Sequence, residues 1–251
     1  MAVTAIDLNA DLAEECGGDD EIFPCLSSAN VCCGAHAGGP EAMAAAVATA
    51  AELGVTVGAH VGYPDRENFG RIAMEMSTDA LYASTYQQIA ALQEVCEHHG
   101  TALRYVKPHG ALYHRVGRDP EQAHAVAQAV AAFELDLHLL VPNTPTITTA
   151  AAAADLECRF EYFADRGYNV DGTLVDRTLP GAMLTDTREI VDRAMRWLET
   201  GVVRAIDGSD IEVVAQSICL HGDEPEAVAS ARALRAECDR RGYAVRSWRA
   251  R

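Results

Sequence analysis

Positive charge is scarce in this sequence of 251 residues. Only 20 Lys and Arg residues stand against 37 Asp and Glu residues, which gives a formal net charge of -17 at pH 7. The acidic residues are spread along the chain, and no basic stripe interrupts them. Nucleic acids and anionic membrane surfaces bind to clustered basic residues, so we expect neither as a partner.

Long apolar runs and targeting segments are missing as well. No apolar stretch approaches the roughly 18 residues that cross a bilayer, and no basic segment followed by an apolar one opens the chain. The eight cysteines include no CxxC pair, which indicates reduced thiols rather than a disulfide framework. We therefore expect a cytoplasmic protein.

The familiar cofactor motifs are also absent. The sequence contains no HExxH, no GxxxxGK[ST] phosphate loop and no GxGxxG after a strand. If ATP is used, it is not held by a familiar loop. Binding of a divalent metal remains an open alternative, because Asp, Asn and His side chains could bind one without a diagnostic spacing.

What is present is a regular alternation of two kinds of segment. Short apolar or β-branched runs predict buried strands at residues 4–11, 27–34, 54–60, 103–110, 136–143, 159–165 and 213–223. Helix-like segments lie between several of them, at residues 40–53, 77–99, 121–133, 186–200 and 226–241, with Pro or Asp before several and Gly after most. Strands alternating with helices predict a parallel sheet, and seven strands in about 250 residues favour a closed (β/α) barrel. No linker or repeat divides the chain, so we expect one domain over residues 1–251.

Polar side chains gather at the ends of the predicted strands. In a parallel barrel these ends form one rim, which is where active sites lie. A lone histidine there is more often structural, but four at equivalent positions favour a functional site. The rim residues are Asp7, Asn9, Asp11, His36, His60, Lys107, His109, Asp165, Arg166, His221 and Asp223.

The adjacent Cys32 and Cys33 precede His36 by only a few residues. Neighbouring side chains of a strand point to opposite faces, so the two thiols are poorly placed to bind one metal. We interpret both as packing residues. The functional residue of this segment is expected to be His36, with Asn30 beside it.

Six ordered segments of the sequence resemble the LamB/YcsF lactam-utilisation family. They are "DLNADLAEE", "SANVCCGAHAGGP", "GAHVGYPDRENFGR", "VKPHGALYH", "EYFADRGYNVDGTLVDR" and "SICLHGDEPEAV". The resemblance implies an irregular seven-stranded (β/α) barrel, similar to the glycoside hydrolase/deacetylase superfamily. It also implies ATP-dependent opening of 5-oxo-L-proline to L-glutamate, with ATP as co-substrate and with partner subunits B and C of 5-oxoprolinase.

The residues that match the family's polar positions supply the candidate site. The expected catalytic residues are Asp11, His60, Lys107, His109 and Asp165. The expected substrate-binding residues are Asn9, Asn30, His36, Arg71, Arg166, Arg177 and His221. If a metal binds, the candidates are Asp7, Asp11, His36, His60 and His221. Glu14 also matches a family position, whereas Gly39 stands where the family usually has aspartate.

Two other functions fit the same rim. One is a metal-dependent deacetylase or amidase acting on a sugar-like or other lactam substrate, suggested by fold analogy. The other is a non-catalytic carrier protein whose rim holds substrate for partner proteins. Rim variants that abolish turnover but keep assembly and substrate binding would argue against the carrier.

Overall fold

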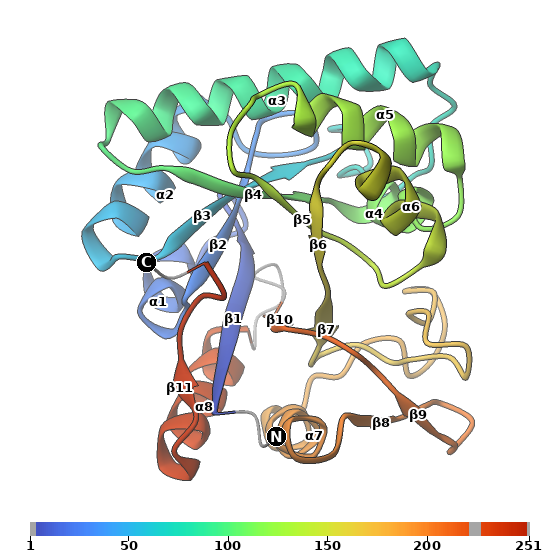
Figure 1. Cartoon of the computed structure of the whole chain (residues 1–251). Coiled ribbons are helices and arrows are strands. Elements are labelled where there is room, and N and C mark those ends of the chain that lie inside the picture. Colours follow the sequence, from blue (N-terminus) through green and yellow to red (C-terminus); the bar gives the residue numbers. More distant parts are fainter. Residues whose placement is uncertain (1–3, 221–226, 250–251) are drawn as a thin grey trace.

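One curved sheet forms the centre of the molecule. The computed structural model describes residues 4–220 and 227–249, and its strands run in the order β6-β5-β4-β3-β2-β1-β10-β7 (Figure 1). All neighbours on this path pair in parallel. The strands are β1 (Ala5–Leu12), β2 (Ser28–Cys32), β3 (Thr56–Val61), β4 (Leu103–Pro108), β5 (His138–Leu140), β6 (Glu157–Arg159), β7 (Glu161–Phe163) and β10 (Ser217–Leu220).

The two ends of this strand order meet in a single segment of chain. β6 pairs with β5 and β7 pairs with β10, yet only Phe160 separates them. Phe160 donates its N–H to the Gln216 side chain at 3.0 Å and accepts the Gln216 N–H at 2.9 Å. The expected (β/α) barrel is confirmed as a nearly closed one. It has eight strands rather than seven, because β6 lies almost entirely before the strand predicted at residues 159–165 and only Phe160 separates it from β7.

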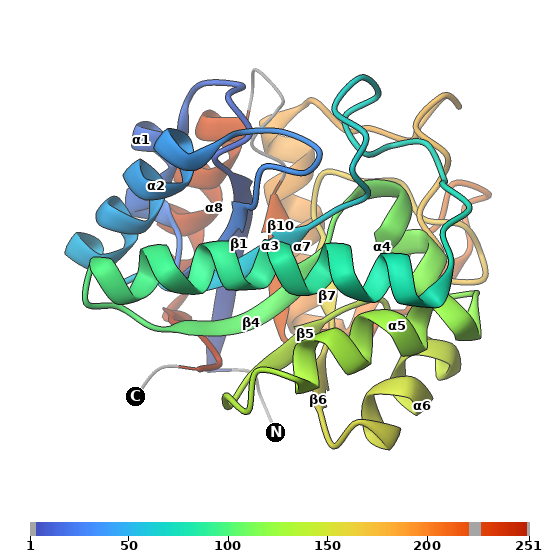
Figure 2. The same ribbon diagram turned by 90° about the horizontal axis from the view of Figure 1, so that it is seen from above.

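Helices surround the barrel, and they begin and end where the sequence signals predict. The Ser77, Asp119 and Asp186 side chains accept N–H groups at the starts of α3, α5 and α7, whereas Gly54 and Gly201 end α2 and α7 in the left-handed conformation. The helices are α1 (Asp19–Ile22), α2 (Pro40–Leu53), α3 (Thr78–His98), α4 (Gly110–Val116), α5 (Pro120–Ala131), α6 (Pro145–Ala153), α7 (Thr187–Thr200) and α8 (Ala227–Arg241), with a 3-10 turn η1 (Phe23–Cys25). α3 and α5 lie side by side in both ribbon views (Figures 1 and 2).

Some small elements were not anticipated from the sequence. α4 and α6 are short, and the strands β8 (Val202–Arg204) and β9 (Asp210–Glu212) form an antiparallel pair outside the barrel. β11 (Ala244–Val245) adds to the start of β1. Short elements carry too few residues for hydrophobic periodicity to identify them.

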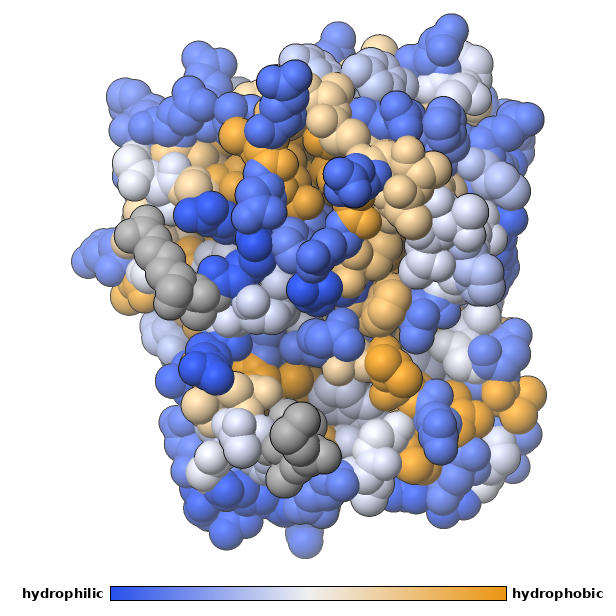
Figure 3. Space-filling view, in the orientation of Figure 1, coloured by the Kyte–Doolittle hydropathy of each residue, from blue (hydrophilic) through white to orange (hydrophobic). Residues whose placement is uncertain are grey.

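The ends of the barrel differ in character. Figure 2 shows long connections after β3 and β7 at one end and both chain termini at the other. Hydrophilic residues cover most of the face seen in Figure 3, with hydrophobic patches between them. Within the described ranges, no helix is both long and apolar enough to cross a membrane.

Candidate active site

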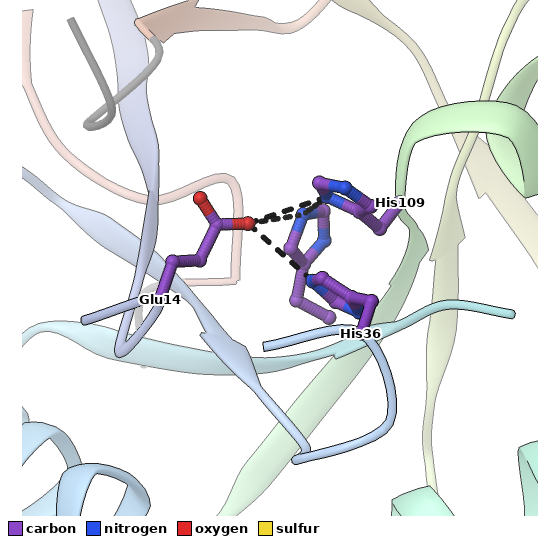
Figure 4. Close-up of side chains that lie close together, drawn as sticks. Glu14, His36 and His109 are labelled. Atoms are coloured by element: carbon purple, nitrogen blue, oxygen red, sulfur yellow. Dashed lines mark hydrogen bonds and ion pairs between the residues drawn. The ribbon is translucent and has the colours of Figure 1, made fainter. Parts of the chain in front are cut away.

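Four buried side chains converge where the barrel strands end. They are Glu14 from the segment after β1, His36 after β2, His60 near the end of β3 and His109 just after β4. Each offers one ligand atom, and these atoms all lie within 4.8 Å of one another. Figure 4 shows the Glu14 carboxylate pointing toward the rings of His36 and His109. We call these four residues the histidine cluster.

One carboxylate oxygen forms the centre of the histidine cluster. Oε1 of Glu14 lies 3.3 Å from Nδ1 of His109, 3.4 Å from Nε2 of His36 and 3.8 Å from Nε2 of His60. The rings of His36 and His109 are stacked, with centroids 3.8 Å apart. His60 and His109 also meet directly, because Nε2 of His60 lies 2.9 Å from Nδ1 of His109.

Backbone carbonyls orient two of these rings. Nδ1 of His60 lies 3.2 Å from the carbonyl of Lys107, and Nε2 of His109 lies 2.9 Å from the carbonyl of Phe69. A carbonyl oxygen only accepts, so a neutral ring carries its proton on that side. The facing nitrogens of His60 and His109 then present lone pairs to each other and to Glu14. A proton or a metal cation between them removes this repulsion.

The charge states of Glu14, His36 and His109 are those that a metal requires. Burial lowers the pKa of His36 to about 4 and also lowers the pKa of His109, so both rings are neutral near pH 7. Burial alone would raise the pKa of Glu14, but its contacts with the His109 and His36 rings hold it well below its usual range. Metal ligands must be deprotonated, as these are.

The spacing also fits a small divalent ion. Ligands at about 2.1 Å from a tetrahedral centre are separated by roughly 3.4 Å. The three distances from Glu14, 3.3, 3.4 and 3.8 Å, are close to that value. Imidazole and carboxylate ligands suit Zn²⁺ and similar transition metals. The cluster could therefore hold a divalent metal, through His36 and His60 as anticipated and through Glu14 and His109 in addition.

A buried ion-pair chain lies directly below the cluster. Asp11 Oδ2 is 3.2 Å from Nε2 of His60, and Asp11 Oδ1 is 2.9 Å from Nζ of Lys107. The same ammonium group is 2.9 Å from Glu161 on β7 and 3.2 Å from the Cys219 thiol. Burial opposes the charge, yet Asp11, with Cys219 and Glu161, raises the pKa of Lys107 well above its ordinary value. Lys107 is thus a charged group that orients Asp11.

The two predicted amide residues extend this network across the barrel. The Asn30 side-chain amide donates to Asn9 Oδ1 and to Asp11 Oδ1, both at 2.7 Å. The Tyr105 hydroxyl donates to Asn30 Oδ1 at 2.6 Å. Asn9 and Asn30 are fully buried. The Asn30 amide therefore fixes Asp11, and neither amide faces open solvent.

Asp7 lies at the other end of the same strand. Its carboxylate accepts hydrogen bonds from Ser27 at 2.6 Å, from Ser28 at 2.7 Å and from Ser217. Burial raises the pKa of Asp7. Asp11 lies four positions further along the strand, which corresponds to about 13 Å. The structure does not bring this metal candidate to the histidine cluster.

The remaining predicted residues lie around the mouth or outside the described chain. The buried Arg166 donates to the carbonyls of Ala182 at 3.0 Å and Val175 at 2.6 Å, and so holds the connection after β7. The Arg71 guanidinium lies 4.9 Å above the Phe69 ring. Asp165 is buried and Arg177 is half-buried. His221 and Asp223 lie outside the described residues.

Two residues that form the site were not among the expected catalytic, binding or metal residues. Glu14 stands in an acidic run after β1, where it resembles a solvated charge. The backbone explains its direction, because Ala13 and Glu15 on either side both have φ of 61° and the Ala13 N–H bonds to Asp19 at 2.8 Å. Glu161 could have been found as a charged residue inside an otherwise apolar strand.

Glycines let the β3 connection pack against His36. A Cβ at Gly62 would lie 2.4 Å from His36 Nδ1, and one at Gly70 would lie 2.8 Å from His36 Cβ. A side chain at Gly62 must therefore displace the ring. We expect Gly62→Ala to weaken metal binding by about 10- to 100-fold, as disturbances of ligand orientation do.

The matched control is Gly39→Ala. A Cβ at Gly39 meets nothing within 4 Å, and its φ of -173° is ordinary extended backbone. Titration with Zn²⁺ followed by calorimetry compares both variants with the parent protein. Equal affinities for Gly62→Ala and Gly39→Ala would show that the ring position does not matter.

The fold and the site together define a class of protein. It is a nearly closed parallel (β/α) barrel with a buried cluster of imidazole and carboxylate groups at the carboxyl ends of its strands. The chain belongs to the LamB/YcsF family, whose profile matches residues 6–251. This confirms the resemblance drawn from the six segments.

Individual relatives agree with this assignment. The chain is 46% identical to the A subunit of 5-oxoprolinase from Kocuria rhizophila, over 98% of this chain and 100% of that protein. The crystal structure of a lactam utilization protein from Thermus thermophilus superposes with a TM-score of 0.91 at 41% identity, covering 97% and 100% of the two chains. A CE4 family pseudoenzyme mutant, at 10% identity and a TM-score of 0.52 over 97% of this chain and 65% of that one, shares the fold.

Proposed function

We propose that this chain is the A subunit of an ATP-dependent 5-oxoprolinase, which opens 5-oxo-L-proline to L-glutamate together with subunits B and C. The observation that carries the proposal is the near-complete match to a protein named as the A subunit of 5-oxoprolinase, 46% identical over its full length. The buried histidine cluster supplies a site for the chemistry.

The reaction explains why ATP is needed. An unstrained five-membered lactam is a poor electrophile, and phosphoryl transfer from ATP to its oxygen activates the ring carbon. Water then adds to that carbon, and the C–N bond breaks as the nitrogen takes up a proton. The acyl phosphate that results is hydrolysed by a second water to the carboxylate and phosphate. Each addition of water needs a base, and the nitrogen needs an acid.

The geometry suggests how the residues divide this work. Glu14 and the imidazoles of His60 and His109 are placed to bind a cation or to accept a proton from water. A bound divalent ion would supply Lewis-acid activation of water or of the lactam oxygen. Asp11 holds His60, and Lys107 holds Asp11, so both act through another group. Asp165 and His221 are proposed in the catalytic and substrate-binding roles expected from the sequence, whereas Arg166 holds the connection after β7.

Reconstitution tests the proposal. Purified chain, alone and together with subunits B and C, is assayed on 5-oxoproline with and without ATP. We expect glutamate and ADP only from the complete complex with ATP. No turnover by a correctly assembled complex would refute the function.

A second candidate is a metal-dependent amidase or deacetylase. The metal-capable histidine cluster favours it, because such a site can activate water without ATP. Release of amine or acetate by the isolated chain with Zn²⁺ and without ATP would identify this activity. If the complex works and cluster variants keep full turnover, the chain is a carrier.

A further inference from the structure

A pocket lined by three arginines opens beside the histidine cluster. It has a volume of about 530 Å³ and lies between the start of α5, the helix α4 and the β3 connection. It is lined by Arg71, Ala73, Ala111, His114, Arg115, Arg118, Asp119 and Pro120. In a chain with a net charge of -17, three arginines around one cavity stand out. We call it the arginine pocket.

One of the lining arginines is neutralised and another is not. Arg115 lies 2.8 Å from Asp119 and 3.2 Å from Glu75, so its charge is already balanced. Arg118 is exposed and makes no ion pair with any residue of the described ranges. An exposed guanidinium without a carboxylate partner is available to an anionic ligand.

The guanidinium group of Arg166 adds positive charge near the pocket, whereas the imidazole of His114 is neutral near pH 7. His114 is exposed at the wall yet surrounded by protein, and this desolvation, with the charges of Arg166, Arg118 and Arg177, lowers its pKa to about 4. Burial, with the charges of Arg177 and Arg71, likewise lowers the pKa of Arg166 to about 10. Asp176 and Asp165 offset part of this charge. Burial is the larger cause of both shifts, and the neighbouring guanidinium groups add to it.

The arginine pocket is coupled to the histidine cluster through a single aromatic ring. The Arg71 guanidinium covers the Phe69 ring at 4.9 Å, and that ring lies 5.5 Å from the His109 ring. The Ala111 N–H donates to the Gly70 carbonyl at 3.0 Å, which fixes α4 against this connection. A ligand in the pocket is therefore within reach of a substrate at the cluster.

We propose that the arginine pocket binds a phosphoryl group, with Arg118 as its principal unpaired ligand and Arg71 on the side of Phe69. A phosphate carries up to two negative charges and accepts bidentate hydrogen bonds from guanidinium groups. The guanidinium groups of Arg118 and Arg71 line the same cavity and can share one phosphoryl group between them. The inference deepens the proposed function, because a lactam phosphorylated on oxygen would place its phosphate beside the reacting carbon.

Direct binding to the isolated chain tests the inference. Calorimetry at fixed ionic strength measures the affinity for inorganic phosphate and, separately, the affinity for 5-oxoproline. Both are measured for the parent chain and for Arg118→Ala. We expect phosphate to bind and Arg118→Ala to weaken it by about tenfold or more, with 5-oxoproline unaffected. The control is Arg188→Ala on α7, whose side chain is 91% exposed and lies 3.8 Å from Asp192. It should leave phosphate binding unchanged, and thermal unfolding should show both variants folded.

Three results would overturn the inference. The first is that the parent chain does not bind phosphate. The second is that Arg118→Ala binds phosphate as tightly as the parent chain does. The third is that Arg118→Ala loses binding of 5-oxoproline and keeps binding of phosphate. The third would assign the pocket to the substrate carboxylate. Because this assay needs neither ATP nor partner subunits, an inactive complex with intact phosphate binding would refute only the proposed function.

Discussion

Glu14→Gln is expected to lower the turnover number of the reconstituted complex by about 10²- to 10⁴-fold, the range typical of a lost acid-base group. Oε1 of Glu14 lies within 3.8 Å of ring nitrogens from all three cluster histidines. Glutamine keeps the size of the side chain but removes the negative charge that pairs with a proton or a metal. Metal content, measured by mass spectrometry, should fall together with turnover.

The neighbouring Glu15 provides a matched control. Glu15 lies on the same turn of chain as Glu14. Its side chain is 61% exposed and lies 3.7 Å from Arg66. Glu15→Gln should keep parental turnover and metal content. If Glu14→Gln and Glu15→Gln behave alike, the cluster is not the reaction centre.

Lys107→Met is expected to destabilise the fold by about 3–5 kcal/mol at pH 7.5, the usual cost of breaking a buried ion pair. Lys107 is 2% exposed and pairs with Asp11 and Glu161, each at 2.9 Å. Removing the ammonium group leaves two carboxylates without their cation in the barrel interior. Urea unfolding measures the free energy, and Arg188→Ala, which breaks an exposed pair, should change it by less than about 0.5 kcal/mol.

The pH dependence of this variant has a definite sign. Burial already raises the pKa of Glu161 above its ordinary value with Lys107 in place, and loss of the cation raises it further. The folded state then holds a proton that the unfolded state releases above about pH 4.5. The stability of Lys107→Met is therefore greatest below that pH and is lost as pH rises through the raised pKa. If the loss of unfolding free energy relative to the parent protein grew from pH 7.5 down to pH 5, the role assigned to the buried ion pair would be wrong.

Glu161→Gln in the Lys107→Met background separates the two carboxylates. Glutamine removes the charge that was left unpaired on β7, so the double variant should regain part of the lost stability at pH 7.5. If the double variant is no more stable than Lys107→Met, the deficit arises from packing and not from charge.

Much of the architecture is a local property of the sequence. Apolar runs with helix starts at Pro40, Asp119 and Asp186 predicted the alternation of strands and helices, because strand pattern and helix capping depend on neighbours in the chain. The parallel barrel followed from that alternation. The sequence also predicted that His36, His60 and His109 lie close together, as they do in the structure. The prediction rests on the fact that the strand ends of a parallel barrel share one edge.

Only the tertiary structure decided which polar residues share the site. Asp7, Asn9 and Asp11 alternate along β1 and look equivalent in sequence, yet the sheet places Asp7 among serines far from the cluster. Glu14 enters the cluster only because two residues with positive φ turn the chain back. Glu161 meets Lys107 only because the barrel brings β7 around to face β4. Sequence periodicity determined the elements, and the closure of the barrel, a long-range event, determined the contacts between their side chains.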